Sequence, residues 1–419
     1  MSLFDHHIAL FGENIPWLEG LREKARTAFL DSGLPTAKTE AWKYSYINKN
    51  VFETLQKDDT PHQCDGHCHK DEKLPFAAYQ IKYCNGKLTH IAHDLPRGVI
   101  VYPLYEAIEN GEIKPYLNKL FALRDFPFAA LNTAFLEEGL LIIITKGTVL
   151  DKPLYLHYHQ HAGINRWCNI RNILAVEKDA QITLIEHFDA EGGAQYFNNV
   201  VNELYVGNNS ALHHYKVQNE AAKSYHVALN CVQIKSGGKY NEFVAHSECA
   251  LARTENYVCL TQEKASAQIN GVYDLRQNGV SDITSNIRHL APQTSSNQLV
   301  KGVLDGSARG VFQGQIHIAP DAQQTTGYQL HRALLLSENA EVDCKPELEI
   351  YADDVKCSHG ATSGDLDAEQ LFYMQSRGIP LEIAKKILVQ AYLSEVLNKI
   401  EDSAVAKWIK SELHQDSDF

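Results

Sequence analysis

The 419-residue sequence lacks the short motifs that mark several large enzyme classes. It contains no G-x-x-x-x-G-K-[ST] segment, which excludes nucleotide hydrolysis by a P-loop. The G-x-S-x-G nucleophile elbow and the H-E-x-x-H zinc motif are missing as well. Its glycines do not follow the Rossmann pattern, which also requires a strand–helix–strand setting. The sequence therefore predicts a protein without a standard catalytic signature.

Long apolar runs and an excess of positive charge are also missing. No apolar run reaches the roughly 18–20 residues of a membrane span. The formal net charge of −13 argues against nucleic acid and anionic membranes as main partners. The first residues, MSLFDHHIALFGEN, include acids and lack the order of a secretory signal or a transit peptide.

The nine cysteines are odd in number and scattered, unlike the disulfide framework of a secreted protein. We interpret most of them as buried, reduced thiols and expect a cytoplasmic protein. Five potential metal ligands crowd into residues 62–69, but their spacing fits no standard zinc module, and opportunistic binding by a loop stays open. These are His62, Cys64, His67, Cys68 and His69.

Short alternating runs rich in Val, Ile, Leu, Tyr and Thr dominate the middle of the chain, as expected for strands. Turn pairs precede them at steps close to multiples of about 14 residues; Asp179-Ala180 and Asn209-Ser210 lie 30 apart, and Gly237-Gly238 follows 28 later. Stacked coils of equal circumference give such a step. We predict a mainly β protein with a β-helix core, and a β-sandwich with chance spacing is the alternative.

Helical patterns flank this core, so we expect three domains: mostly helical at 1–138, β-helical at 139–362 and helical at 363–419. Residues 14–33 and two segments within 101–138, PLYEAIENG and KPYLNKLFALRD, carry apolar residues at helical spacing.

Near the C-terminus, Asp367 with Gln370 three residues later resembles a capping box. The helix that they begin is expected to end at Arg377, followed by Gly378. Pro380 then begins a second helix.

Cys357 and His359 follow ELEIYADDV, which alternates like a strand. Residues two apart on a strand share a face, so one thiol and one imidazole would project together. This pair is half of a soft-metal site, and packing with a hydrogen bond is the structural alternative. A second subunit could complete the site if the strand lies at a sheet edge, because edges recruit other strands.

The paired carboxylates of Asp353 and Asp354 suggest a different function. A β-helix with surface acids could be a polysaccharide-active enzyme, in which acid groups transfer protons. No Asp- and Asn-rich cluster marks a sugar groove, so this remains the alternative. The two acids could also orient ligands or keep the edge soluble.

Several segments resemble the SufD family of iron–sulfur cluster assembly scaffold subunits of the SUF system. They are PELEIYADDVKCSHGAT at 346–362, EQLFYMQSRGIP at 369–380, GLPTAKTEAWKYSYIN near the N-terminus and GVFQGQIHIAPDAQQTTGYQLHRALLLS before the last strands. The resemblance implies a right-handed parallel β-helix core flanked by N-terminal and C-terminal α-helical domains.

The resemblance also implies partners. SufD pairs with its paralogue SufB through the final strands, here including Glu349, Tyr351, Asp353 and Val355. An isolated chain could instead form a homodimer through this edge. A nascent iron–sulfur cluster would lie between a SufB cysteine and the histidine that corresponds to His359, with Cys357 beside it as a family cysteine.

The C-terminal helices would bind the SufC ATPase, with Tyr373, Arg377 and Gly378 as the expected contacts and Leu371 and Phe372 in the core. The chain itself would bind no nucleotide and catalyse no reaction. SufB carries its essential cysteine where this chain has Leu330, and its N-terminal cysteine motif is absent here. The sequence therefore fits SufD better than SufB.

Overall fold

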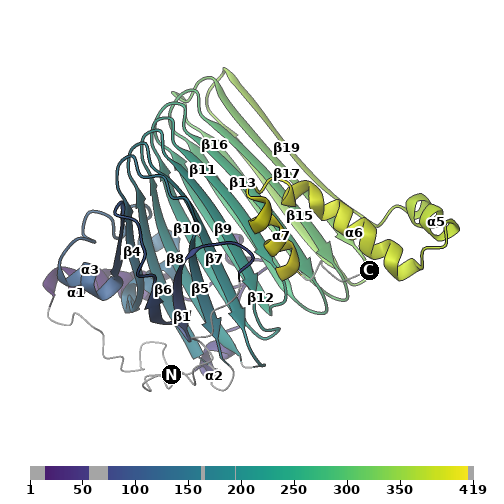
Figure 1. The fold of residues 1–419 in the computed structure, drawn as a ribbon, viewed down its shortest axis with the longest axis horizontal. Coiled ribbons are helices and arrows are strands. Elements are labelled where there is room, and N and C mark those ends of the chain that lie inside the picture. The colour runs from purple at the N-terminus through teal and green to yellow at the C-terminus, as the bar shows by residue number, and fades with distance from the viewer. Residues whose placement is uncertain (1–14, 56–73, 162–165, 194, 414–419) are drawn as a thin grey trace.

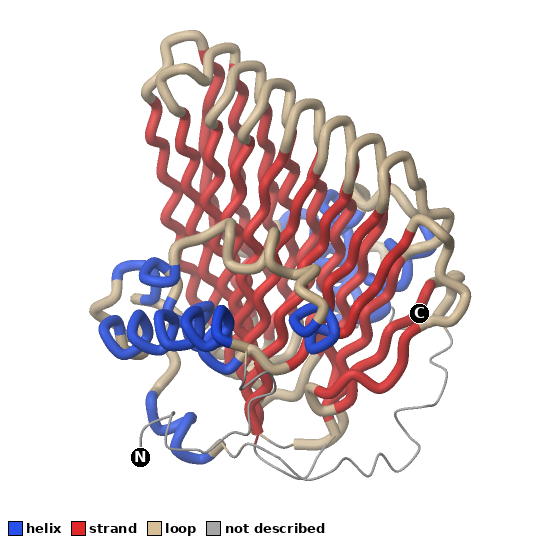
Figure 2. Tube along the Cα trace, turned by 90° about the vertical axis from the view of Figure 1, so that its left-hand side faces the viewer, coloured by secondary structure: helices blue, strands red, loops and turns tan. Residues whose placement is uncertain are grey.

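The computed structural model describes residues 15–55, 74–161, 166–193 and 195–413 (Figure 1). Within them the chain is a parallel β-solenoid, in which each coil adds one strand to each of two sheets. Successive coils stack along one direction, and their turns form a staircase in Figure 2. The β-helix prediction is confirmed, and the β-sandwich alternative is wrong.

One sheet has ten strands and the other has nine in the described residues. The ten-stranded sheet has the spatial order β19 (Val355–Gly364), β17 (Thr325–Leu335), β15 (Ser295–Leu304), β13 (Ser266–Leu275), β11 (Lys239–His246), β9 (Ala211–Asn219), β7 (Gln181–Ala190), β5 (Leu154–Gln160), β1 (Tyr79–Cys84) and β2 (Lys87–Ile91). The nine-stranded sheet has the order β18 (Glu341–Ile350), β16 (Arg309–Ile318), β14 (Val280–His289), β12 (Leu251–Leu260), β10 (Tyr225–Ile234), β8 (Tyr196–Val206), β6 (Arg166–Val176), β4 (Glu138–Ile144) and β3 (Val99–Pro103).

The strand register explains the period seen in the sequence. Gln181 pairs with Ala211 and Ala211 with Lys239, so one coil takes 30 and then 28 residues. A coil holds two strands and two turns, which makes the step of about 14 residues half a coil. The named strands pair in parallel except β1 with β2 and β3 with β4, which are antiparallel.

Several turns between strands contain a residue in the left-handed conformation, as at Asp179, Asn209, Gly237 and Gly306. Short polar side chains and glycine adopt this conformation at the lowest cost. At Gly306 a side chain would also lie 3.0 Å from the backbone of Gln277 on the preceding coil. The small and polar turn pairs in the sequence therefore reflect both backbone conformation and close stacking.

The interior of the solenoid combines apolar packing with stacked asparagines. Leu156, Phe188, Leu204, Val232 and Ile287 belong to one buried cluster inside the coils. An asparagine ladder runs beside them, with each side-chain amide donating to the carbonyl of the next asparagine at 3.1, 2.8 and 3.0 Å. Buried amides require such partners. The ladder consists of Asn172, Asn202, Asn230 and Asn256.

Helices pack on the outer faces of both sheets (Figure 1). On the nine-stranded sheet, α1 (Pro16–Ser32) and α3 (Leu104–Glu109) share a cluster with Leu141 and Ile173, and α4 (Pro127–Phe135) and α2 (Lys49–Thr54) pack in a neighbouring cluster. On the ten-stranded sheet lie α6 (Leu381–Leu397) and α7 (Ser403–Glu412), preceded in the chain by α5 (Ala368–Ser376). Whether residues 1–138 and 363–419 form separate domains stays a prediction.

The helix predicted for KPYLNKLFALRD does not form; this segment consists of turns and a short 3₁₀ helix at Leu123–Asp125. The buried carboxylate of Glu203 accepts hydrogen bonds from the backbone amides of Asn118, Lys119 and Leu120 at 2.7, 2.9 and 3.4 Å. Asn118 also adopts a positive φ of 55°. A carboxylate from a distant strand therefore replaces the hydrogen bonds that a helix would supply.

Candidate functional site

The solenoid ends in two strands at the same end of the molecule. β18 and β19 are the last strands of the two sheets, and each pairs with one neighbour among the described strands, β16 and β17. β19 forms an outer border of the sheets in Figure 1. Each strand therefore has a free edge that can accept another strand. Pro346 in β18 fits this position, because proline is tolerated on edge strands.

Cys357 and His359 lie on β19, in register with Gly327 and Gln329. Gly327 and Gln329 are buried on the inward side of β17, so the thiol and the imidazole both belong to the inward row of the last coil. His359 is exposed, because no described strand covers it. The structure thus brings the predicted pair to one face, which opens at the end of the solenoid.

The surroundings of Cys357 are more apolar than those of His359. The half-buried thiol packs against a cluster that contains Ile316 and Ile318. Burial raises the pKa of Cys357, opposed by a backbone hydrogen bond with Gly327. A metal ion would favour the thiolate, because it binds the deprotonated form.

The residues predicted for the paralogue interface surround this end. Glu349 points outward from β18, where Gln315 donates to it at 3.0 Å and His317 Nδ1 lies 3.1 Å away. Tyr351 is 62% exposed, and Asp353 is exposed in the connection to β19. Val355 is half-buried against the same cluster as Cys357. The edge offers both polar and apolar surface.

Cys344 on β18 is a free, half-buried thiol. Its Sγ lies 2.9 Å from Nδ1 of His331, and Nε2 of His331 lies 2.8 Å from the hydroxyl of Tyr273. Burial raises the pKa of Cys344 to about 11 and lowers that of His331 to about 4. Near neutral pH the thiol therefore donates to a neutral imidazole. Strand alternation in VDCKPELEI could have indicated that Cys344 faces inward, but not that it meets His331.

The helix α5 carries the residues predicted to contact an ATPase. None of its residues is buried, and Tyr373 is 63% exposed. The guanidinium of Arg377 lies 5.9 Å from the ring centre of Tyr373, and Gly378 follows with a positive φ of 84°. The expectation that Phe372 belongs to the core is wrong, because its side chain is 73% exposed. In Figure 1 this helix stands away from the sheets.

The remaining residues singled out in the sequence add little to the candidate site on β19. The His and Cys cluster at 62–69 lies outside the described residues. Asp354 is exposed, and its backbone amide donates to the side chain of Gln323 at 2.9 Å. Among the seven described cysteines six are free thiols, whereas Cys84 is disulfide-bonded.

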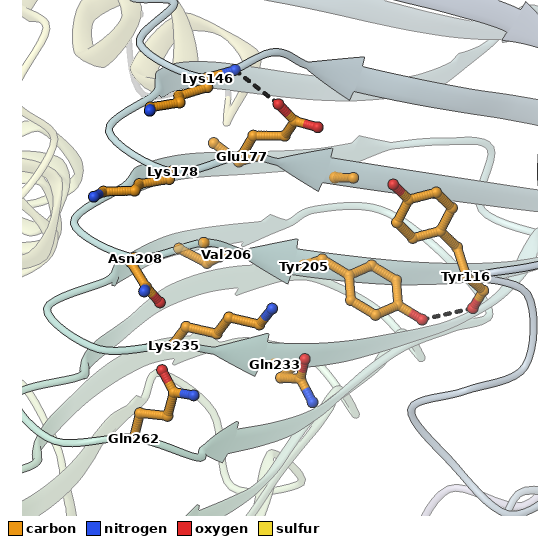
Figure 3. A pocket seen from close by; sticks show the side chains of 13 residues that line it. Tyr116, Lys146, Glu177, Lys178, Tyr205, Val206, Asn208, Gln233, Lys235 and Gln262 are labelled. Atoms are coloured by element: carbon orange, nitrogen blue, oxygen red, sulfur yellow. Dashed lines mark hydrogen bonds between the residues drawn. The ribbon is translucent and has the colours of Figure 1, made fainter.

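A shallow cavity of about 480 Å³ crosses the turns of several coils (Figure 3). Three lysines line it. The carboxylate of Glu177 accepts a hydrogen bond from the backbone amide of one of them, Lys146, at 2.9 Å. Tyr205 donates to the carbonyl of Tyr116 at 2.5 Å. None of the thirteen residues that line this cavity supplies a thiol or an imidazole, so it does not suit a soft metal.

The fold and the open end define a class of protein, a parallel β-solenoid that presents a thiol and an imidazole at uncovered edge strands. The family described as "SUF system FeS cluster assembly, SufBD core domain" matches residues 159–392, and the SufBD N-terminal region matches residues 1–156. The chain belongs to the SufBD family of iron–sulfur cluster assembly proteins and resembles its SufD members.

Individual relatives agree with this assignment. The iron–sulfur cluster assembly protein SufD of Escherichia coli is 29% identical over 92% of this chain and 90% of its own length. The chloroplastic protein ABCI7 of Arabidopsis thaliana is 32% identical over 96% and 87%. A SufBD family protein of Synechocystis is 32% identical over 65% of this chain and 62% of its own length. These matches do not favour the polysaccharide-active alternative.

Proposed function

We propose that the chain is a non-catalytic scaffold subunit of an iron–sulfur cluster assembly complex. It pairs with a SufB-like paralogue through β18 and β19 and binds a SufC-like ATPase through α5 and α6. His359, with Cys357 beside it, holds iron or a nascent cluster as transient cargo together with ligands of the paralogue. The complex works in the cytoplasm, in line with the mostly free thiols. No described helix is both long and apolar enough to cross a membrane.

The joint end of both sheets carries this proposal. β18 and β19 present two free edges side by side, and a second solenoid could add a strand to each by main-chain hydrogen bonding. Exposed apolar side chains flank these edges, including Ile350 at 40% and Tyr351 at 62%. The same edges would support a homodimer when the paralogue is missing.

The ligand chemistry supports a shared and temporary site. One imidazole and one thiol cannot complete a four-coordinate iron site, so a partner must supply the other ligands. An imidazole binds soft iron–sulfur species less tightly than a thiolate, which suits cargo that must leave. Since the chain lacks a P-loop, ATP hydrolysis belongs to the partner. ATPase closure would shift the population towards an opened interface.

Anaerobic reconstitution with both partners tests the proposal. The chain is coexpressed with its SufB-like and SufC-like partners, and the purified complex receives ferrous iron and sulfide. We expect His359→Ala to reduce cluster absorbance and bound iron at least tenfold, and Cys357→Ala to have a smaller effect. Ser358→Ala is the matched control, because this exposed neighbour points to the opposite face of β19.

The complex must still assemble in each variant, which size-exclusion chromatography shows. A His359→Ala complex that assembles and retains wild-type iron would refute the role of the imidazole. If the wild-type chain joins neither partner, the scaffold assignment fails as a whole.

A further inference from the structure

A second group of metal-ligating side chains lies far from β19, on the outer face of β5 and β7. These parallel neighbours place His157 opposite His187 and His159 opposite Asp189. Tyr158 and Phe188 face the interior cluster, so the residues on either side of them face outward. Two sequence segments 30 residues apart thus combine their imidazoles and a carboxylate on one surface.

The donor atoms of His157, His187 and Asp189 all lie within 4.8 Å of one another. Nε2 of His157 is 3.0 Å from Oδ1 of Asp189, and the rings of His157 and His187 stack with centres 5.2 Å apart. Metal–ligand bonds of about 2.0–2.2 Å place tetrahedral donors roughly 3.3–3.6 Å apart. Shifts of about 1 Å would therefore gather the three donors around one ion.

Two side chains of the helix α7 contact His187 in this group. Its Trp408 ring meets His187 edge-on with centres 5.1 Å apart, and Oε2 of Glu412 lies 3.4 Å from Nε2 of His187. The hydroxyl of Tyr155 lies 2.6 Å from the other nitrogen of His187. The ion would bind Nε2 of His187, on the side of Glu412, while the Tyr155 hydroxyl on Nδ1 fixes the ring orientation and tautomer.

An approach from solvent exists beside the group. Asp189 and Glu412 line a cavity of about 560 Å³, together with residues of the turns after β7 and β9. His187 is buried, whereas the side chains of His157 and Asp189 are 13% and 29% exposed. Packed strands thus hold the three donors, and one of them, Asp189, lines the cavity. Three protein ligands would leave a coordination position open towards it.

We propose that His157, His187 and Asp189 form a binding site for one divalent first-row transition-metal ion of the Zn²⁺, Co²⁺ and Fe²⁺ type. Two imidazoles and one carboxylate are a ligand set that such ions prefer, whereas Mg²⁺ and Ca²⁺ require mostly oxygen donors. Six strand spacings separate β7 from β19, roughly 29 Å. The site is therefore distinct from the proposed cluster ligands and does not depend on them.

Metal titration of the full chain tests this site. The chain is purified without a histidine tag, stripped with a chelator and titrated with Co²⁺, followed by competition with Zn²⁺ and anaerobic Fe²⁺. We expect one ion per chain at this site, with visible absorption typical of nitrogen and oxygen ligands, and little competition from Mg²⁺. Asp189→Asn and His157→Gln should each weaken Co²⁺ binding at least tenfold.

Three further variants make the test selective. His213→Gln on the outer face of β9 removes a neighbouring imidazole that is not in the group, and should leave Co²⁺ binding unchanged. His359→Ala should also leave it unchanged. His161→Gln reports on a second donor group of His159, His161 and Glu191.

Circular dichroism and thermal unfolding of each metal-free variant show whether it folds, and Asp189→Asn preserves shape if His157→Gln does not. The proposal is overturned if Asp189→Asn binds Co²⁺ as tightly as the wild type. It is also overturned if His161→Gln or His359→Ala abolishes binding while His157→Gln retains it. A wild-type chain that binds no ion at this position would show that the group is a hydrogen-bonded contact with α7.

Discussion

The middle coils and the last coil of the solenoid follow the same alternating strand pattern, but they treat histidine differently. In the middle coils, the two ring nitrogens of His246 lie 2.8 and 2.9 Å from the hydroxyls of Ser281 and Thr254. His289 is enclosed in the same way by Thr294 and Ser296. His359 occupies an inward row as well, yet it is exposed because no described strand follows β19. A covering coil therefore decides whether an inward imidazole is structural or available.

Burial has an electrostatic consequence that strengthens this contrast. It lowers the pKa of His289 to about 4 and does the same for His331, one strand before the end. These imidazoles remain neutral at physiological pH and serve as hydrogen-bonding partners. The change from a sealed to an open environment thus occurs within a single coil.

The largest expected effect is on the free energy of unfolding, when a buried side chain of the middle coils is truncated and compared with one in the last coil. Phe188 stacks on Tyr158 with ring centres 4.4 Å apart, and the ammonium of Lys216 lies 4.0 Å from the Phe188 ring centre. We expect Phe188→Ala to lower the free energy of unfolding by about 3–5 kcal/mol. Leu348→Ala in the last coil should cost less than about 2 kcal/mol, because Leu348 is half-buried. Urea unfolding of both variants checks this difference, and equal losses would contradict the contrast.

The second effect is a dependence of stability on pH. The folded pKa of His289, about 4, lies below its ordinary value of about 6.5, so the unfolded chain binds more protons between these values. Stability due to this neutral imidazole is therefore present above pH 6.5 and is lost as the pH falls towards 4.

The free energy of unfolding of the wild type should fall as the pH drops from 6.5 to 4. In His289→Gln we expect this fall to be smaller by roughly 2–4 kcal/mol. Urea unfolding at several pH values measures the slope. Ser358→Ala, an exposed substitution that does not titrate, should keep the wild-type slope. If His289→Gln keeps it too, the buried imidazole does not titrate on unfolding as described.

Much of the fold was predictable because local patterns repeat with the coil. The turn pairs marked strand starts, and the carboxylate of Asp367 accepts the amides of Glu369 and Gln370 as its capping position indicated. The segment after Ile113 could not be predicted, because a carboxylate 85 residues away from Asn118 determines its hydrogen bonding. Local spacing has no information about such a partner.

The candidate sites were also predictable only where they depend on local spacing in the sequence. The shared face of Cys357 and His359 follows from strand alternation alone. The contact of Cys344 with His331 and the grouping of His157 with His187 depend on which strands become neighbours, which requires the register between coils. The exposure of Phe372 could not be predicted from the sequence either. In a short helix with adjacent apolar residues, the sequence does not show which of them packs against the rest of the protein.

The smallest effect on stability concerns α5, which differs from both regions of the solenoid because none of its residues is buried. Replacing Phe372 and Tyr373 together by serine should change the free energy of unfolding by less than about 0.5 kcal/mol, as expected for exposed positions. If α5 binds the ATPase, the same variant should weaken that binding at least tenfold, since exposed aromatic side chains often dominate an interface. Calorimetry with the purified SufC-like partner measures the affinity.

Leu30→Ser on α1 is the matched control, because Leu30 is 57% exposed on a helix at the opposite end of the chain. An equal loss of affinity in Leu30→Ser, or no loss in the double variant, would mean that the apolar face of α5 is not the docking surface.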